Sequence, residues 1–499
     1  MRSVQHRRLP FGIQKVTANH ALIMLVSIGV CLTTLALTIV LVRNGRPTLG
    51  LPVGYLYLLL LIHVPGAVAH LTPKSNLPYK EFTETGIRYT AFGCVAFVVG
   101  LWLARVGGVK RGLIFPHPGP DFLRFCLIGG WIVTFSLRPI LVRIPSLGAA
   151  VDNGGRIWLL AVILALPLCF LRRDWRGFLI WASAMLVYPV MGLVNTGFLS
   201  YGTTTTVLAF SLFAVVIRSW WKLGLIIAVV SVLGMGLFVS YFTIREDIRG
   251  TVWGGHSLEE RVNESGRMLR EFKTFDLEDE KHLKAVNARL NQNVFVGMAA
   301  ARLNRGVVDY YRGRTLWEGV LSVIPRAFWP GKPVFGGSHG IINQMTEFEV
   351  NEKTTSYGVG NVMEFYINFG LPSLIAGFIA FGWLLGKLDR LAATAWIEGR
   401  FTDLIKMFLP AVAIIRPEHS TVEIVGSAVA ALVATFFWAQ AWRPGGKGNG
   451  GVSPQTTGQR WQSGSRLDGL PVSSGSESGS ASEVQSRDWE ETSRDDFRF

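Results

Sequence analysis

The residues of this chain that could do chemistry are cations, carboxylates and one imidazole that stand beside long apolar runs. In chain order they are Arg245 and Arg249, Arg326 and Lys332, Glu364, and the group Arg416, Glu418 and His419. An ionisable side chain at or near bilayer depth is costly to bury and is therefore a candidate functional residue. Arginine and lysine bind phosphate oxygens, while a carboxylate or an imidazole accepts a proton from a hydroxyl. The set predicts a cationic site that handles a membrane-anchored phosphate or pyrophosphate.

The short turn between the last two apolar runs reads IIRPEHS. It contains Arg416, Glu418 and His419, and Glu423 follows one helical turn later. Solvation of a short turn does not need so many ionisable groups, and histidine is the usual proton carrier near neutral pH. The sequence therefore favours His419 with Glu418 as a proton acceptor, and Glu364 is the other candidate for that role.

Each candidate also has a purely structural interpretation, which the sequence leaves open. Arg245 and Arg249 could snorkel to the membrane surface from the end of an apolar run. Arg326 could stack on Trp329 and stiffen a turn. Glu364 could cap a helix N-terminus or neutralise an arginine. The IIRPEHS turn could be a polar hairpin without chemistry.

Composition indicates a membrane protein. Of 499 residues 49% are hydrophobic and 17% charged, whereas a soluble domain carries about a quarter charged residues. The apolar residues fall into runs of roughly 17 to 23, the length that crosses about 30 Å of hydrocarbon. The eleven runs are His20 to Val42, Leu51 to Ala69, Tyr89 to Ala104, Phe122 to Leu137, Ile157 to Leu171, Gly177 to Val194, Phe198 to Val216, Leu223 to Phe242, Val362 to Leu385, Leu404 to Ile415 and Thr421 to Trp442. We expect an all-α polytopic membrane protein with about 11 (10–12) transmembrane helices.

Charge and loop length divide the chain into four parts. We expect an N-terminal transmembrane block of about eight spans at 1–243, a large, partly helical extracytoplasmic loop at 244–360, a block of about three spans at 361–442, and a disordered Gly/Ser-rich cytoplasmic tail at 443–499. The basic stretches that we interpret as cytoplasmic loops are RRDWR at Arg172, RSWWK at Arg218, GKLDR at Gly386 and RPGGK after Trp442. Eleven spans would place the basic N-terminus outside, so we expect an extra short or re-entrant helix in FSLRPILVRIPSLGAA. The N-terminal run is interpreted as a retained first span, because no small-residue cleavage site follows it.

Several classes of function are disfavoured. The net charge of +15 comes from basic residues that cluster at the ends of apolar runs, so no nucleic-acid partner is expected. All four cysteines lie in or beside apolar runs, and His256, His282 and His339 have no ligand-like spacing, so no metal site is expected. The sequence has no Walker A loop, HExxH or GxSxG motif, and no cofactor is expected.

The run RGRTLWEGVLSVIPRAFWPGKP and the following EFYINFGLPSLIAG, with many spans and one large late loop, give the chain a resemblance to a known family. It resembles the bacterial oligosaccharide repeat-unit polymerases, the Wzy-type O-antigen and exopolysaccharide polymerases. The likeness in motifs covers Tyr310 to Gly377, and for the rest of the chain it is architectural. The tail after Arg443 departs from the family core.

The resemblance implies a glycosyltransferase of the bacterial inner membrane, with its large loop in the periplasm. Such proteins transfer a growing chain from undecaprenyl pyrophosphate to a hydroxyl of the next lipid-linked unit, and they work with flippase and chain-length regulator partners. The positions that match the family pattern are Pro325, Arg326, Trp329, Pro330, Lys332, Glu364, Tyr366, Asn368, Gly370 and Arg416.

The resemblance and the residues together give one hypothesis for the site. The cations that would bind and stabilise the departing pyrophosphate are Arg245, Arg249, Arg326, Lys332 and Arg416. The aromatic residues that would stack on sugars, or else anchor the chain at the membrane interface, are Tyr310, Tyr311, Trp317 and Trp329.

Two other functions remain open. An O-antigen ligase would share the large loop but transfer finished glycan to a lipid or protein acceptor. A transporter or flippase would do no covalent chemistry and would carry charged residues at mid-span, where Arg124 is one of few.

Overall fold

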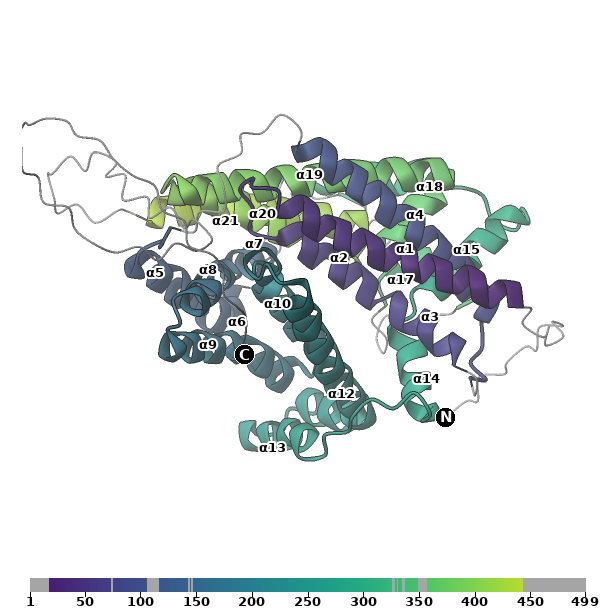
Figure 1. The fold of residues 1–499 in the computed structure, drawn as a ribbon, viewed down its shortest axis with the longest axis horizontal. Coiled ribbons are helices and arrows are strands. Elements are labelled where there is room, and N and C mark those ends of the chain that lie inside the picture. The colour runs from purple at the N-terminus through teal and green to yellow at the C-terminus, as the bar shows by residue number, and fades with distance from the viewer. Residues whose placement is uncertain are drawn as a thin grey trace, which may run out of the picture. The chain divides into compact units, whose positions relative to one another are not determined.

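The computed structural model describes residues 18–72, 75–105, 116–141, 144, 147–324, 328–329, 331–333, 337–348 and 357–442, which fold almost entirely into helices (Figure 1). Within these residues nine helices are long and apolar enough to cross a membrane. The chain is thus an all-helical, polytopic membrane protein, as predicted. Arg326, Pro325, Pro330 and the predicted tail at 443–499 lie outside the described residues.

The first part of the chain contributes seven of the nine long helices, some of them broken into shorter pieces. Its elements are α1 Ala18–Val42, α2 Leu51–Leu61, α3 Val64–Leu71, α4 Lys80–Arg105, α5 Pro120–Trp131, the π-helix η1 Ile132–Leu137, α6 Arg138–Leu141, α7 Leu147–Gly155, α8 Ile157–Leu171, α9 Trp175–Thr196, α10 Ser200–Ser211, α11 Phe213–Val216 and α12 Trp220–Trp253. The pieces α2 with α3, α5 with η1 and α6, and α7 with α8 each make one candidate span. The stretch predicted to hide an extra helix forms η1, α6 and the start of α7. Because α7 continues into α8 through a turn at Arg156, it adds no further span to the described residues.

Five helices are described in the segment between α12 and the last block of spans. They are α13 Leu258–Arg270, α14 Glu280–Arg289, α15 Asn293–Asn304, α16 Arg314–Ser322 and α17 Ser338–Met345. Helices were expected here as part of a large loop, and one of them, α15, is almost wholly buried and packs closely on α4. Gly86 of α4 and Gly297 of α15 permit this approach, since a Cβ on either would collide with the backbone of the other helix. The segment is therefore integrated with the bundle.

The last block comprises α18 Asn361–Phe369, α19 Leu371–Ile397, α20 Phe401–Ile414 and α21 Thr421–Ala441. The predicted run Val362 to Leu385 is two helices, which separate at Gly370, a glycine with φ of 72°. The prediction that GKLDR at Gly386 is a cytoplasmic loop is wrong, because this stretch lies inside α19 and the apolar helix continues to Ile397. The carboxylate of its buried acidic residue, Asp389, accepts hydrogen bonds from the loop before α2 and lies near Arg105 of α4.

Each of the eleven apolar runs forms helix, although α10 with α11 and α20 are too short to count among the nine long helices. If these two also cross, successive helices place the N-terminal end of α1 and residues 254–360 on one side of the membrane, here called the loop side. The turns at 172–174 and 217–219 then lie on the opposite side.

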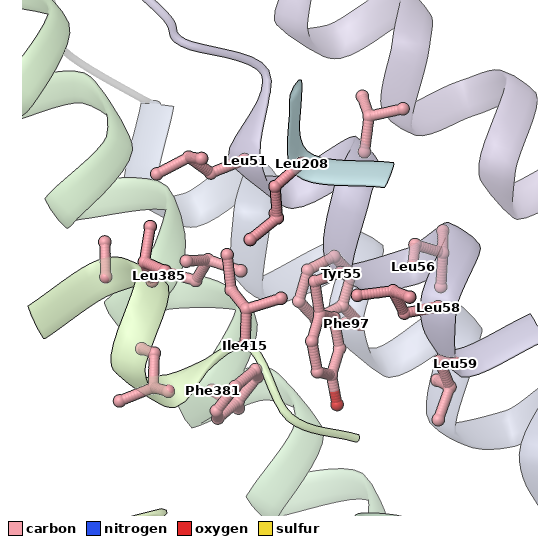
Figure 2. Packing of buried hydrophobic residues seen from close by; sticks show 14 of the residues in the cluster. Leu51, Tyr55, Leu56, Leu58, Leu59, Phe97, Leu208, Phe381, Leu385 and Ile415 are labelled. Carbon is pink, nitrogen blue, oxygen red and sulfur yellow. The ribbon is translucent and has the colours of Figure 1, made fainter. Parts of the chain in front are cut away.

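The core joins both blocks of spans. Figure 2 shows Tyr55 of α2 beside Phe97 of α4, with Phe381 of α19 and Ile415 close by. The ring centroid of Tyr55 lies 5.0 Å from that of Phe97 and 4.6 Å from that of Phe381. Ile415, which is fully buried, immediately precedes Arg416, so the core fixes the start of the turn that carries the predicted site residues.

Candidate functional site

A cavity of about 230 Å³ lies where α8, α9, α10 and the turn between α20 and α21 meet. Its polar lining is Arg156, Thr204, Thr205, Arg416, Glu418 and His419, and its aromatic lining is Trp158, Tyr188 and Phe198. Three residues that the sequence analysis placed in one turn thus share a cavity with an arginine from the distant turn between α7 and α8. We call residues 415–420 the His419 turn.

The depth of the His419 turn in a membrane depends on the length of α20. The helix has 14 residues, which rise about 20 Å, whereas the hydrocarbon is about 30 Å thick. If the turn between α19 and α20 lies at one membrane surface, the His419 turn falls short of the other surface by about 10 Å. The cavity then places its charges within the depth of the bilayer, where they are shielded little by salt.

Hydrogen bonds from Gly360 and Asn361, at the start of α18, hold the backbone of the His419 turn. Gly360 N–H donates to the carbonyl of Glu418 at 3.1 Å, and Asn361 N–H donates to that of Pro417 at 2.9 Å. The Asn361 amide Nδ2 reaches the carbonyl of His419 at 3.5 Å. Asn361 also accepts a hydrogen bond from the buried hydroxyl of Tyr55, at 2.9 Å. Three consecutive carbonyls of the turn are therefore fixed to the helical core.

His419 lies between two carboxylates. Its Nδ1 is 3.2 Å from Oε2 of Glu423, and its Nε2 is 3.5 Å from Oε1 of Glu418. Burial lowers the pKa of the imidazole, but the hydrogen bond with Glu423 and the charges of both carboxylates outweigh burial and the opposing charge of Arg156, so the pKa is raised. The arrangement fixes the ring and stabilises the imidazolium that forms when His419 accepts a proton.

Glu423 is fixed by contacts of its own. Its Oε2 accepts the backbone N–H of Ser420 at 2.8 Å and the hydroxyl of Ser338 at 3.2 Å. Ser420 and Glu423 form a capping box at the N-terminus of α21. Sequence analysis noted Glu423 but assigned it no role; the S-x-x-E spacing of a capping box was the available signal.

Arg156 is the main site residue that sequence analysis missed. It lies in the turn between α7 and α8, where its N–H donates to the carbonyl of Asn153 at 3.3 Å. Its charge acts on His419 from across the cavity. The available signal was a lone arginine directly before the strongly apolar run that begins at Ile157.

A second group of cations lies beside the cavity. The guanidinium of Arg249 stacks 4.7 Å from the ring of Phe198, which lines the cavity, and that of Arg245 lies 4.5 Å from the ring of Phe242. Arg289 of α14 stacks on Tyr357 at 4.4 Å. Burial lowers the pKa of Arg289, and the charges of Arg245 and Arg249 lower it further. The charges of the three arginines thus act on one another.

Glu364 lies outside the cavity. It is fully buried, and its Oε2 accepts the backbone N–H of Thr421, the first residue of α21, at 2.6 Å. Burial raises the pKa of Glu364 to about 7, although hydrogen bonds from Thr421 and Thr315 oppose the shift. The contact places this carboxylate at a helix N-terminus and joins α18 to α21.

The other predicted residues do not line the cavity. Lys332 Nζ donates to the carbonyls of Ser322 and Ile324, at 3.1 and 2.8 Å, where α16 ends. The Tyr311 hydroxyl donates to Gln344 at 2.6 Å. Tyr310 lies beside Gly370, Trp317 is exposed on α16, and Trp329 accepts the N–H of Lys332 through its carbonyl.

A separate buried charge pair lies at the opposite end of the bundle. Asp389 of α19 accepts hydrogen bonds from the hydroxyl of Thr48 at 2.6 Å and from the N–H groups of Leu49 at 3.0 Å and Leu51 at 3.2 Å. A guanidinium nitrogen of Arg105 lies 3.8 Å from the same carboxylate, and both side chains are 1% exposed or less. We call this group the Asp389 clamp. Its contacts join the loop before α2 to α4 and α19.

Among the described residues no group of three His, Cys, Asp or Glu side chains is arranged to hold a metal ion. The four cysteines are free thiols.

One family model matches the chain, over residues 79–408, which is more than half of its length; its description is "Domain of unknown function (DUF8712)". The matched range includes Arg156, Arg245, Arg249 and Glu364 and ends just before the His419 turn. No curated protein and no solved structure matches the chain.

Proposed function

We propose that this chain, which belongs to the DUF8712 family, is a membrane glycosyltransferase that polymerises oligosaccharide repeat units linked to a lipid pyrophosphate such as undecaprenyl pyrophosphate. The observation that carries the proposal is the cavity, which Arg156 and Arg416 line together with His419. The imidazole of His419 is hydrogen-bonded to Glu423 and lies near Glu418. Guanidinium groups suit a pyrophosphate, and a fixed imidazole suits the proton of a sugar hydroxyl.

The reaction assigns one task to each side of the cavity. The anomeric carbon of the donor glycan loses its bond to the pyrophosphate oxygen and gains a bond to the acceptor hydroxyl oxygen. Arg156 and Arg416 stabilise the negative charge that develops on the departing pyrophosphate. With Nδ1–H of His419 donated to Glu423, Nε2 accepts the proton of the hydroxyl, and lipid pyrophosphate leaves.

The size of the cavity limits what it encloses. A drug-sized ligand usually occupies roughly 300 to 1,000 Å³, so about 230 Å³ suits a pyrophosphate and part of one sugar. The rest of the glycan would extend to the segment at 254–360. There the aromatic side chains proposed to stack on sugars are those of Tyr310, Tyr311, Trp317 and Trp329. Arg245 and Arg249, with Arg289, would attract the anionic substrate before it enters.

Charge supports the proposed side of the membrane. If α10 with α11 and α20 also cross, RRDWR at Arg172 and RSWWK at Arg218 would lie on the side opposite to residues 254–360. The positive-inside rule would place these basic turns in the cytoplasm and the loop side in the periplasm of a bacterial inner membrane. That is also the side on which flippase and chain-length regulator partners would act together with a polymerase.

Analysis of lipid-linked and surface glycans in a strain without the gene tests the proposal. A polymerase predicts that single repeat units accumulate and that long chains disappear. Full-length glycan left on its lipid carrier would instead assign the protein as a ligase, and an unchanged glycan would exclude both.

Complementation then tests the cavity itself. Arg416→Ala should fail to restore polymer at a normal protein level. Arg400→Ala is a matched control, because Arg400 lies in the turn between α19 and α20 and pairs with Glu398 and Asp403 on the surface. Normal polymer from Arg416→Ala would refute the assignment of the cavity as the site.

A further inference from the structure

A second, apolar groove lies between α1, α2, α10 with α11, and α12, and it encloses about 70 Å³. Its walls include Leu35 and Ile39 of α1, Val53 of α2, Phe210 of α10, and Leu223 and Val230 of α12. Nearly all of its exposed lining is carbon. The groove therefore suits a hydrocarbon chain and offers little to a polar ligand.

The groove exists because α12 packs loosely on this part of the bundle. The helix has 34 residues and makes its main contacts with α13, α9 and α14, near its other end. At the inner end of the groove the Tyr57 hydroxyl and Ser231 Oγ form a hydrogen bond of 2.7 Å. From Val230 to Lys222 the helix rises about 12 Å, which is most of one leaflet of a hydrocarbon layer about 30 Å thick.

Three cations lie at the end of the groove where α1 ends and α12 begins. Arg43 follows α1, Arg218 follows α11, and Lys222 directly precedes Leu223 of the groove wall. Arg43 donates from Nε to the carbonyl of Ala214 at 2.7 Å, from Nη1 to that of Arg218 at 3.5 Å and from Nη2 to that of Ile217, and its guanidinium stacks on Trp220 at 4.6 Å. These bonds hold its charge beside the turn after α11 and leave two of its five N–H groups for a ligand. Arg218 and Lys222 are exposed. Within the described residues none of the three cations forms an ion pair.

The surroundings of these cations are those of a membrane interface. Trp220 and Trp221 are 50% and 69% exposed, as is typical of aromatic side chains at the headgroup level. The charge of Arg218 lies near enough to Arg43 to contribute, after burial, to lowering the pKa of Arg43. An anion between these cations would relieve that repulsion.

We propose that the groove binds one acyl chain of an anionic glycerophospholipid, whose phosphate is held by Arg43, Arg218 and Lys222. The chain fills the space that loose packing leaves, and the headgroup bridges α1, α11 and α12. The lipid then fastens α12 to the bundle on the side opposite to the cavity. This site is separate from the proposed glycosyl transfer and does not depend on it.

Native mass spectrometry of the full-length protein in detergent tests the site, with phosphatidylglycerol and phosphatidylcholine of identical acyl chains as probes. Phosphatidylglycerol should be retained preferentially and should raise the melting temperature more. Because each cation near the surface contributes about 1 kcal/mol of attraction to anionic lipid, Arg218→Gln and Lys222→Gln should each weaken the binding of phosphatidylglycerol about fivefold and leave that of phosphatidylcholine unchanged. Equal retention of both lipids by the wild type would refute the headgroup assignment.

Val230→Trp tests the groove, because the larger side chain occupies the space of the acyl chain. It should lower the retention of both lipids several-fold. Val229→Trp is the matched control, since Val229 is 48% exposed on the same helix and does not line the groove. Identical retention in the two tryptophan variants would exclude the groove. Should Val230→Trp fail to fold, the two exposed charge variants still decide the headgroup assignment.

Discussion

The Asp389 clamp buries both of its charged side chains, at 1% exposed or less, whereas the His419 turn leaves His419 and Glu418 34% and 37% exposed beside a cavity. At the clamp, Asp389 receives three hydrogen bonds and the charge of Arg105, and every one of these partners belongs to the protein. At the turn, Arg416, Glu418 and His419 line a cavity of about 230 Å³. The turn therefore has space for a ligand beside its charged groups, whereas the charge of the clamp is compensated by groups of the protein.

The two regions also differ in which contacts fix them. The carboxylate of Asp389 is itself the centre of its group, so the clamp depends on one side chain. The His419 turn is fixed through the backbone carbonyls of Pro417, Glu418 and His419, which leaves its side chains to face the cavity. Substitution of a side chain should accordingly damage stability at the clamp and activity at the turn.

The largest effect is expected from Asp389→Ala. It leaves Arg105 buried without its counter-charge and removes the acceptor of the N–H groups of Leu49 and Leu51. Breaking a buried ion pair on one side costs about 3 to 5 kcal/mol. We expect a large fall in melting temperature in detergent and in the amount of protein in the membrane. Lys387→Ala, on a half-exposed position of the same helix, is the control and should change neither.

Arg416→Ala should produce the opposite pattern. Removal of one preorganised charge from a transition-state site costs about 10²- to 10³-fold in rate, while the turn keeps its backbone hydrogen bonds. We expect polymer synthesis to fall by that factor with a melting temperature close to that of the wild type. A fall in stability as large as that of Asp389→Ala would show that the two regions do not differ in the way proposed.

The sequence was sufficient for the fold class and for the turn, for physical reasons. Runs long enough to cross hydrocarbon must be helical, because no other partner is present there for the backbone. Arg416, Glu418 and His419 are close in sequence, so their proximity needed no knowledge of tertiary packing. Arg156 and Arg289 meet the other site residues only through packing between distant helices, which hydropathy does not encode.

The same limit explains the misassigned stretch GKLDR. We predicted a loop there because the charges of Asp389 and its neighbours interrupt an apolar run. The partner that permits burial, Arg105, lies on another helix more than 280 positions earlier in the chain. Lys332 and Glu364 were identified by type and spacing, yet both side chains make contacts with helix termini.

The pH dependence of the reaction should reveal the environment of His419. Because Glu423 and Glu418 raise its pKa against the effects of burial and Arg156, the neutral imidazole that accepts a proton is present only above that raised pKa. We expect the rate of polymerisation to rise with pH, with a midpoint above 6.5. Glu423→Gln should move the midpoint downward and reduce the rate about tenfold, which is less than the roughly 10²- to 10⁴-fold cost of losing the general base itself. An unchanged midpoint in Glu423→Gln would show that another group controls the profile.

The smallest effect on activity is expected from Glu364→Gln, and it separates the two roles that the sequence left open. If Glu364 serves as the acceptor for Thr421 N–H, the amide oxygen of glutamine replaces it, and the rate should stay within about fivefold of wild type, since one neutral hydrogen bond is worth about 1 kcal/mol. A loss of 10² or more, as for a general base, would show that Glu364 acts in the active site.

The pH dependence of stability gives an independent measure of the environment of Glu364. Burial raises the pKa of Glu364 from 4.5 to about 7, so the folded state binds the proton more tightly, and the stability of the wild type should decline as pH rises from about 4.5 to 7. Glu364→Gln has no proton to lose, and its melting temperature in detergent should decline less over the same interval.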